Sequence, residues 1–504
     1  MAFLLRSVMR GDSVNSVKII MLNPPFLPKY SRASRSPAVT KSGTIYYPTW
    51  LAYATGVLEA SGHVVRLVDA PASALDAMAV LDMLDEFEPD LVVVDTSTAS
   101  ILSDLRFAEE IKLRRRSSFV VLVGTHVSAL PTQALEQAPG VDAVARREYD
   151  YTVRDLAAAL SSHEDLSKVL GLSYRTDGRV VHNEDRPLIS NLDNLPFVSE
   201  VFKRHLNIGN YFYAHLQYPM VSIFTSRGCP AQCIWCLYPQ VFYGHQFRHR
   251  SPENIASEFA YIADALPQVR EVLVDDDTFT IDVKHTRRTC ELLIKQGNRL
   301  PWTCEVRVNN LDFETMQAMR EAGCRLLVAG FESGNAQILK NMKKGTTPDQ
   351  GRKFVRDARR AGLLVHGCFV AGNPGESKET LQETLDYAKR LDLDTAQFFP
   401  IMVYPGTEAF DWAKTQGYLL TEDFSQWLTA DGLHNTIIDL PGLDHRQLVD
   451  WCDFARRSFY LRPRYVIYKV AQALVNPREF RRTLKASRRF YRFLFKRSSD
   501  SARI

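Results

Sequence analysis

The chain has 504 residues, 45% of them hydrophobic and 24% charged, with a net charge of +4. At roughly 150 residues per domain, this length predicts two to four domains, and the ordinary composition excludes a chain dominated by disorder. There is no apolar run of roughly 18 residues or more, which argues against a transmembrane helix. The short apolar stretch within residues 1–13 lacks a small-residue cleavage site, so we interpret it as an additional N-terminus and not as a signal peptide.

Strand-like and helix-like segments alternate over the N-terminal third. Strands are expected at 17–25, 64–69, 91–95, 119–124 and 141–145, with helices at 50–61, 74–87 and 102–115. Alternation at this spacing predicts an α/β domain with a doubly wound, Rossmann-like and mostly parallel sheet. Ligands of such domains bind beyond the carboxyl ends of the strands.

A second alternating series follows a linker expected at 161–217, which contains a hairpin at 172–181. Strands are expected at 220–224, 272–274, 302–308, 326–331, 364–370 and 396–401. Six strand–helix units predict a partial (β/α)6 barrel with its active residues at the strand ends. We therefore expect a first domain at 15–160, a barrel at 218–420 and a helical C-terminal region at 421–504.

Three of the eight cysteines lie in one short segment, residues 226–239 (SRGCPAQCIWCLYP). Their spacing is Cys-x3-Cys-x2-Cys, directly after an expected strand. Cys229, Cys233 and Cys236 can bind three irons of a cubic [4Fe–4S] cluster and leave the fourth iron open to a ligand. Gly228 and Pro230 suit a tight loop around such a cluster.

Structural zinc is the alternative for this loop. Such sites usually have four ligands in two close pairs, and His245 and His249 lie far from that spacing. The other cysteines are scattered and do not form a disulfide framework, which fits a reducing cytosol. We interpret these five as small core residues: Cys290, Cys304, Cys324, Cys368 and Cys452.

The cysteine loop resembles the signature of the radical S-adenosylmethionine superfamily, including the aromatic residue Trp235 before the third cysteine. The resemblance covers roughly residues 218–410. It implies that S-adenosylmethionine chelates the open iron and is split to a 5′-deoxyadenosyl radical, which abstracts hydrogen from an unactivated carbon. It also implies a reductant such as flavodoxin or ferredoxin.

Acidic residues follow the second barrel strand, in the segment 273–279 (LVDDDTF), where the family often has a Gly-Gly-Glu turn. Asp275, Asp276 or Asp277 would suit the methionine ammonium group; the alternative is a helix cap or a solvated loop. On the third strand, Glu305 and Arg307 share one face. They are expected to contact S-adenosylmethionine or substrate, or else to take part in an ion pair with each other or with a neighbour.

Two further strand ends, residues 330–334 (GFESG) and 367–376 (GCFVAGNPGE), resemble turns that lie near S-adenosylmethionine in the family. Glycines at such turns allow the backbone to approach a flat ligand. The resemblance implies cofactor contacts at Trp235, Glu332, Ser333, Gly372 and Pro374.

The first domain resembles the cobalamin-binding domain that precedes the radical core in one subgroup of the superfamily. The matching segments are 23–25 (NPP), 95–98 (DTST), 124–131 (GTHVSALP) and the acidic turn near Glu148. The cobalamin contacts implied are Thr96, Ser97, Thr98, Gly124 and His126. There is no Asp-x-His-x-x-Gly motif, and the turn RREYD stands where relatives often have a glycine. The alternative is a domain that only shapes the substrate channel.

Residues 456–497 contain fourteen Lys or Arg and one acid, Glu479, interleaved with aromatic residues. A helix at an anionic membrane surface, a nucleic-acid patch, or a helical appendage packed on the barrel would each have this composition. Membrane contact would indicate a lipid substrate. The segments 45–50 (IYYPTW) and 236–240 (CLYPQ) also resemble radical enzymes of hopanoid side-chain maturation.

Together these features predict a cytoplasmic radical enzyme, with possible peripheral membrane contact, that binds a [4Fe–4S] cluster, S-adenosylmethionine and cobalamin. The predicted reaction is cobalamin-dependent C-methylation of a lipid or other secondary metabolite. One alternative is a radical rearrangement or ring formation on a lipid head group without methyl transfer. An alternative of another class is a protein that binds or modifies nucleic acid through its basic tail.

Overall fold

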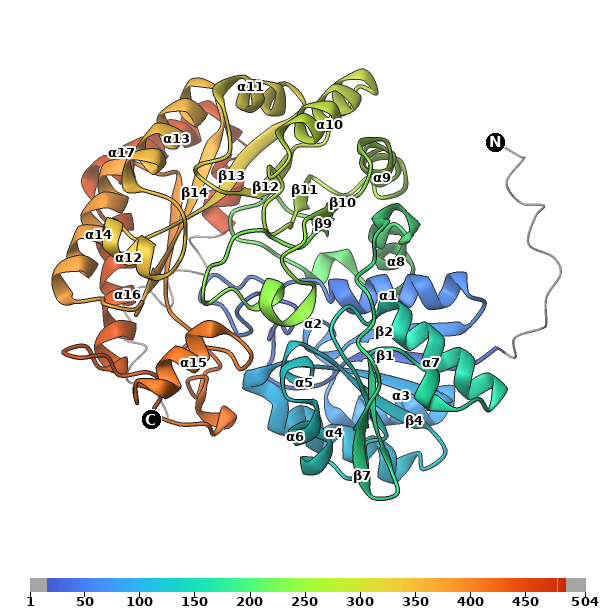
Figure 1. The fold of residues 1–504 in the computed structure, drawn as a ribbon. Coiled ribbons are helices and arrows are strands. Elements are labelled where there is room, and N and C mark those ends of the chain that lie inside the picture. Colours follow the sequence, from blue (N-terminus) through green and yellow to red (C-terminus); the bar gives the residue numbers. More distant parts are fainter. Residues whose placement is uncertain (1–15, 478, 486–504) are drawn as a thin grey trace.

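The first part of the chain folds around a seven-stranded sheet (Figure 1). The structure is a computed structural model that describes residues 16–477 and 479–485. The strand order is β2-β1-β3-β4-β5-β6-β7, and the first five strands are parallel: β1 Lys18–Asn23, β2 Val64–Asp69, β3 Leu91–Thr96, β4 Phe119–Gly124 and β5 Ala143–Ala145. Every residue of β3 is buried, as expected for a strand covered on both faces. The predicted doubly wound sheet is confirmed.

Helices cover this sheet and connect its strands: α1 Thr49–Ala60, α2 Ala70–Ser73, α3 Ala77–Phe87, α4 Ile101–Arg114, α5 Thr125–Ala129, α6 Pro131–Gln137 and α7 Asp150–Ser162. Strand β1 ends at Asn23, earlier than expected, because Pro24 and Pro25 have no N–H to donate to a ladder. The strand order changes direction between β1 and β3. In an open parallel sheet, ligands bind at such a point.

The hairpin expected in the linker belongs to the first sheet. Its strands, β6 Leu172–Thr176 and β7 Arg179–His182, are antiparallel, and β6 pairs with β5. The linker expected at 161–217 therefore contributes two strands, because the short strand β5 would otherwise leave an open sheet edge. Helix α8 Val198–His205 then leads toward the second sheet.

The second sheet has six parallel strands in the order β15-β14-β13-β12-β11-β8. All six predicted strands are present: β8 Met220–Ile223, β11 Glu271–Val274, β12 Trp302–Val306, β13 Cys324–Glu332, β14 Leu364–Ala371 and β15 Thr395–Pro400. A small antiparallel pair, β9 Ser226–Arg227 and β10 Arg248–His249, flanks the cysteine loop. The sheet is curved, and its helices lie on the outside (Figure 1), which confirms the partial barrel.

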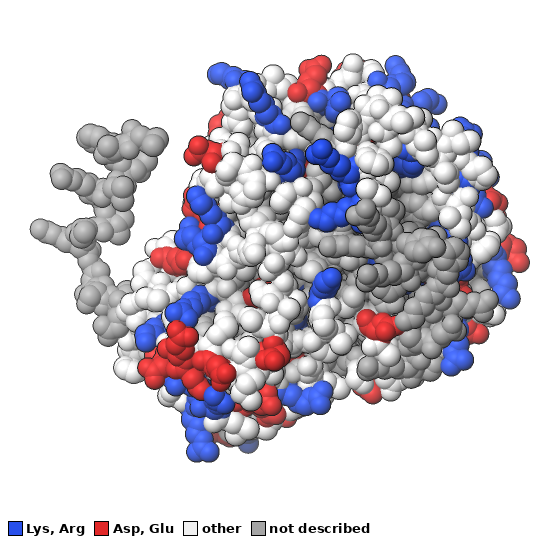
Figure 2. Space-filling model, turned by 180° about the vertical axis from the view of Figure 1, so that it is seen from behind, with Lys and Arg blue, Asp and Glu red and all other residues white. Residues whose placement is uncertain are grey.

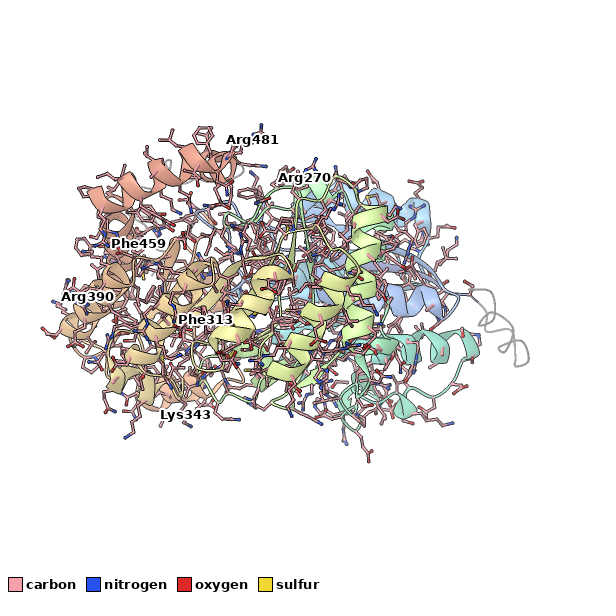
Figure 3. The ribbon with its side chains drawn as sticks, turned by 90° about the horizontal axis from the view of Figure 1, so that it is seen from above. Arg270, Phe313, Lys343, Arg390, Phe459 and Arg481 are labelled. Atoms are coloured by element: carbon pink, nitrogen blue, oxygen red, sulfur yellow. The ribbon has the colours of Figure 1, made fainter. Side chains whose placement is uncertain are left out.

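The outer helices of the barrel are α9 Pro252–Ala265, α10 Val283–Lys295, α11 Phe313–Glu321, α12 Ala336–Asn341, α13 Pro348–Arg360 and α14 Lys378–Leu391. The C-terminal region adds α15 Glu408–Thr415, α16 His445–Tyr460 and α17 Pro463–Val475. Helix α16 packs beside β15, with Phe459 inside the protein, whereas Lys343 and Arg390 lie at the rim (Figure 3). Among the described residues, no helix has the length and apolar character to cross a bilayer.

Candidate functional site

The three cysteines of the loop line one cavity of about 770 Å³. Cys229 and Cys233 are buried, and Cys236 is half-buried. Gly228 has a φ of +87°, and a Cβ at this position would lie 2.0 Å from the backbone oxygen of Gln246. Only glycine therefore allows the loop to turn here, as the sequence analysis expected.

The thiols fit a cubic cluster better than a single ion. In the described part of the chain, no group of three or more His, Cys, Asp or Glu side chains is placed to hold a single metal ion, whereas a cluster needs only one thiolate at each iron. Burial raises the pKa of Cys229 and of Cys236, and nearby Asp277 raises both further. Deprotonation of these thiols thus needs a compensating positive charge, which iron supplies.

Asp276 holds the start of the cysteine loop. It is fully buried, and its carboxylate accepts hydrogen bonds from Thr225 N (2.7 Å), Thr225 Oγ1 (2.6 Å) and Ser226 N (3.1 Å). Burial raises its pKa to about 6. Asp276 was expected at S-adenosylmethionine; in the structure both of its oxygens accept hydrogen bonds from Thr225 and Ser226 at the start of the loop.

Arg35, from the first domain, reaches the acidic residues at the ends of β11 and β12. Its guanidinium lies 2.7 Å from Asp275 Oδ1, 3.1 Å from Asp277 Oδ1 and 3.4 Å from Glu305 Oε1. Tyr243 also donates to Asp277 at 2.6 Å. Burial raises the pKa of Glu305 to about 8, although Arg35 opposes that shift. Sequence reasoning missed Arg35 because it lies 240 residues from Asp275 and belongs to no motif.

Glu305 and Arg307 do not pair with each other. Arg307 Nη1 lies 3.8 Å from Cys233 Sγ, and its other terminal nitrogen donates to the backbone oxygen of Lys344. Both Glu305 and Arg307 line the cavity. A guanidinium beside a cluster thiol is a suitable partner for a cofactor carboxylate.

Glu332 and Trp235 also line the cavity and carry unpaired polar atoms. Lys344 Nζ lies 2.6 Å from Glu332 Oε1. Within the described residues, Glu332 Oε2 and Trp235 Nε1 are buried without a hydrogen-bond partner. Because unpaired buried polar atoms are unfavourable, these two fit a polar cofactor bound in the cavity.

The remaining expected contacts to S-adenosylmethionine support turns and do not line the cavity. Ser333 is fully buried and lies 3.0 Å from Thr384 Oγ1. Gly372 has a φ of +100°, and a Cβ there would lie 2.9 Å from Ile401 Cγ2. The oxygen of Pro374 accepts a hydrogen bond from Asn341. Sequence patterns placed these residues near the site but could not say which of them face it.

The five residues expected at cobalamin meet at the carboxyl ends of β3 and β4. Thr98 Oγ1 lies 3.2 Å from His126 Nδ1, and Ser97 Oγ lies 2.8 Å from Tyr30 OH. Thr96 Oγ1 donates to the oxygen of Val123, and Gly124 has a φ of +113°. A side chain on Gly124 would clash with the backbone of Thr96.

His126 is buried with its ring 4.8 Å from that of Phe424, in the C-terminal region. Burial lowers its pKa to about 3, so the imidazole is neutral. Nearby, Tyr149 OH and Trp427 Nε1 are buried without a partner anywhere in the described ranges. Neutral polar groups and unpaired atoms at this sheet edge fit a large polar cofactor.

Two buried ion pairs join the domains at the cysteine loop. Arg227, two residues before Cys229, binds both oxygens of Asp150 at 2.7 and 3.1 Å. Arg248 binds both oxygens of Glu148 at 2.6 and 2.9 Å. The acidic turn near Glu148 was noted in the sequence, but its partners were not identified. Asp150 thus positions β9, which contains Arg227, and Glu148 positions β10, which contains Arg248.

The C-terminal helices pack against the barrel. Tyr460 OH donates to the oxygen of Ala396 at 2.7 Å, and Tyr465 OH donates to that of Asp394 at 2.8 Å. This agrees with the helical-appendage interpretation for these residues. Lys and Arg mix with Asp and Glu over the rear face in Figure 2. Four tail aromatics, Phe490, Tyr491, Phe493 and Phe495, lie outside the described residues.

Of the five scattered cysteines, four are buried and one is only half-buried. Cys290, Cys304, Cys324 and Cys452 are buried, which agrees with a role as core residues. Cys368 is half-buried, and Gln397 Nε2 lies 3.2 Å from its sulfur. Both Cys368 and Cys452 line the cavity.

Comparison with known proteins agrees with this geometry. Residues 223–388 match the Radical SAM superfamily, and residues 35–157 match the B12 binding domain. An uncharacterized methyltransferase of Pyrococcus horikoshii is 31% identical over 90% of this chain and 94% of its own length. The hopanoid C-3 methylase of Methylococcus capsulatus is 24% identical over 76% of this chain and 72% of its own, so the hopanoid resemblance is distant.

The solved structure of the radical S-adenosylmethionine methyltransferase TsrM from Kitasatospora setae shares the fold. Its TM-score is 0.64 at 19% identity, over 89% of this chain and 84% of that chain. The chain therefore belongs to the radical S-adenosylmethionine superfamily, in the group with an N-terminal B12-binding domain, whose cofactors are a [4Fe–4S] cluster, S-adenosylmethionine and cobalamin.

Proposed function

We propose that this enzyme methylates an unactivated carbon of a lipid or other secondary metabolite that binds in the cavity. One observation carries the proposal: the cavity is lined both by the three cysteines and by residues of the first domain, including Arg35 and Tyr46. When bound, the cluster with S-adenosylmethionine supplies a 5′-deoxyadenosyl radical, and cobalamin supplies the methyl group. A substrate in this cavity would lie between the two domains.

The residues of the cavity wall then orient S-adenosylmethionine. Arg307 offers its guanidinium to the carboxylate, next to Cys233. Glu332 Oε2 and Trp235 Nε1, which have no partner in the described part of the chain, offer hydrogen bonds to polar groups of the cofactor. Asp277 lines the cavity and Asp275 lies behind it, and together these two carboxylates exceed the single charge of Arg35 and provide negative charge for the ammonium group. Glu305, whose pKa burial raises to about 8, offers a neutral carboxyl group as a hydrogen-bond partner beside them.

We assign Asp276, Ser333, Gly372 and Pro374 to the support of these side chains. For cobalamin, we propose that Thr96, Ser97, Thr98 and Gly124 form the edge on which it lies. Small and hydroxyl side chains there allow close approach, and the backbone conformation of Gly124 excludes a side chain. His126 offers a neutral imidazole at the same edge.

The experiment that tests this proposal is anaerobic reconstitution followed by iron, sulfide and corrinoid analysis and product mass spectrometry. We expect about four irons per chain, bound corrinoid, and a product heavier by one methylene. The Cys229/Cys233/Cys236→Ala variant should lose the iron. Cys290→Ala should keep it, since Cys290 is buried outside the loop.

The second candidate is radical rearrangement or ring formation on a lipid head group. Iron and 5′-deoxyadenosine without bound corrinoid and without a mass gain would favour it over methyl transfer. Absence of iron after careful reconstitution would contradict both reactions and would favour a structural zinc site at the cysteine loop.

The enzyme needs an electron donor and a small-molecule substrate, and we propose flavodoxin or ferredoxin as the donor. We further propose that α17 contacts the cytoplasmic face of an anionic membrane. Its outer side chains are exposed: Ile467 by 69%, Val470 by 56% and Leu474 by 82%. The surrounding segment, residues 456–497, has fourteen basic residues against one acid, which complements anionic lipid.

Sedimentation with phosphatidylglycerol vesicles tests this contact. The wild-type chain should bind, and the Ile467→Glu/Leu474→Glu variant should bind several-fold more weakly. Leu113→Glu is the control, because Leu113 is 72% exposed on α4, in the other domain. The proposed contact would be contradicted if the wild type bound neutral phosphatidylcholine vesicles equally well. It would also be contradicted if Leu113→Glu weakened vesicle binding as much as the α17 variant does. Salt-sensitive binding of RNA instead would favour the nucleic-acid interpretation.

A further inference from the structure

Two histidines lie at the opposite end of the cavity from the cysteines. His366 is the third residue of β14, and His215 precedes β8 by five residues. The strands are parallel, so their N-terminal ends share one edge of the barrel, and the cysteine loop follows the other edge. From His366, β14 continues for five residues to Ala371, a distance of ~16 Å at ~3.3 Å per residue. Both histidines and all three cysteines line the same cavity, which therefore extends through the barrel.

The two imidazoles are stacked, with ring centroids 4.8 Å apart and planes inclined by 22°. His366 Nδ1 lies 2.7 Å from Thr395 Oγ1, which holds its ring in place. His366 is 6% exposed. The Nε2 atoms of His366 and His215 are both buried, and neither makes a hydrogen bond of normal geometry within the described residues. The Gln397 side chain, which also lines the cavity, lies close enough to His366 to interact with its ring. Buried polar atoms without partners on two stacked rings are unfavourable unless a ligand or water satisfies them.

The electrostatic surroundings of this pair select a neutral ligand. Burial lowers the pKa of His366 to about 4 and that of His215 well below its usual value, so both rings are neutral. The guanidinium of Arg325 is paired with Glu271 at 2.9 Å and with Glu479 at 2.8 Å. Arg482 also pairs with Glu479. Lys469, which also lines the cavity, lies 3.8 Å from Asp394. Among the described residues, the positive charges around this pair are thus matched by carboxylates, which gives a carboxylate or phosphate ligand no advantage over a neutral one.

Between the two ends, the cavity wall includes apolar side chains, among them Val328, Val370 and Phe398. We propose that His215 and His366 form a subsite for a neutral hydroxyl or carbonyl oxygen at the end of the substrate remote from the reacting carbon. The substrate is then elongated, with an apolar middle and a neutral oxygen at its far end. This inference rests on the proposed function only in taking the cavity as the substrate site.

The test uses two probes of nearly equal size, 2-naphthol and 2-methylnaphthalene, which differ by a hydroxyl in place of a methyl group. Their dissociation constants are measured by fluorescence on the reconstituted full-length chain, corrected for partition from water. We expect the wild type to prefer 2-naphthol. His366→Phe and His215→Phe should each weaken 2-naphthol binding roughly 3–10-fold and leave 2-methylnaphthalene binding unchanged.

His445→Phe is the matched control. Its Nε2 is also buried without a partner within the described chain, but His445 does not line the cavity. For a variant that fails to fold, the wild-type chain labelled with ¹⁵N-histidine provides a second measurement. The Nε2 resonances of two histidines should shift with 2-naphthol and not with 2-methylnaphthalene.

Absence of a wild-type preference for 2-naphthol, equal losses for both probes, or unshifted Nε2 resonances would overturn the subsite. Any of these would mean that the pair holds only water or serves packing. The binding assay needs no turnover. Formation of methylated product without the expected preference for 2-naphthol would therefore refute the subsite alone. The expected preference for 2-naphthol without any methylated product would refute methyl transfer alone.

Discussion

Asp150→Asn should loosen the attachment of the cysteine loop to the first domain. The Asp150 and Arg227 side chains are only 4% and 2% exposed, and the carboxylate binds the guanidinium through both oxygens. Removal of one partner from a buried pair costs about 3–5 kcal/mol. Glu148 remains 3.7 Å from Arg227 and partly compensates its charge. We therefore expect the free energy of unfolding to fall by about 3 kcal/mol.

For folding units of this size, such a loss lowers the melting temperature by roughly 6–12 °C. Differential scanning fluorimetry of the reconstituted chain measures this change, and iron analysis should show reduced cluster content because Arg227 lies two residues before Cys229. Asp82→Asn is the control. Its pair with Arg114 is exposed, and its loss should change stability by no more than about 0.5 kcal/mol.

The double variant Asp150→Asn/Arg227→Met provides the decisive comparison. An apolar replacement removes the unpaired buried charge, so the double variant should recover at least half of the lost stability. A fall in melting temperature of less than about 2 °C for Asp150→Asn, or no recovery in the double variant, would refute this reasoning.

Asp276→Asn should reduce iron retention several-fold without unfolding the barrel, since an amide has one acceptor oxygen for the three donors at the start of the loop; an unchanged iron content would contradict this role. Arg307→Met should weaken S-adenosylmethionine binding about 10-fold by calorimetry, with Arg287→Met on the exposed surface as the control. Burial raises the pKa of Glu376 to about 7, so the wild type should lose stability as pH rises from about 4.5 to 7, because the folded state binds the extra proton. Glu376→Gln should match the wild type at pH 5 and exceed it at pH 8 in thermal melts; a constant difference at both pH values would count against this assignment.

Local sequence patterns were sufficient to predict the cysteine loop and the two sheets of this protein. The spacing of Cys229, Cys233 and Cys236 is a property of one short loop, so it could be read without a fold. The alternation of strand-like and helix-like segments likewise predicted both parallel sheets, because strand and helix patterns depend on near neighbours. A glycine at position 228 was expected from the tight loop, but the backbone oxygen that excludes a side chain there belongs to Gln246, in a later segment.

Tertiary packing decided which side chains meet. Arg35 reaches Asp275 across 240 residues, and Asp150 reaches Arg227 across 77, so neither contact has a local signal. Among the three consecutive aspartates, only the structure shows that Asp276 holds the loop. The pairing of His215 with His366 depends on strand order and register in the barrel. Periodicity determines each element, whereas the packing of distant elements determines the chemistry between them.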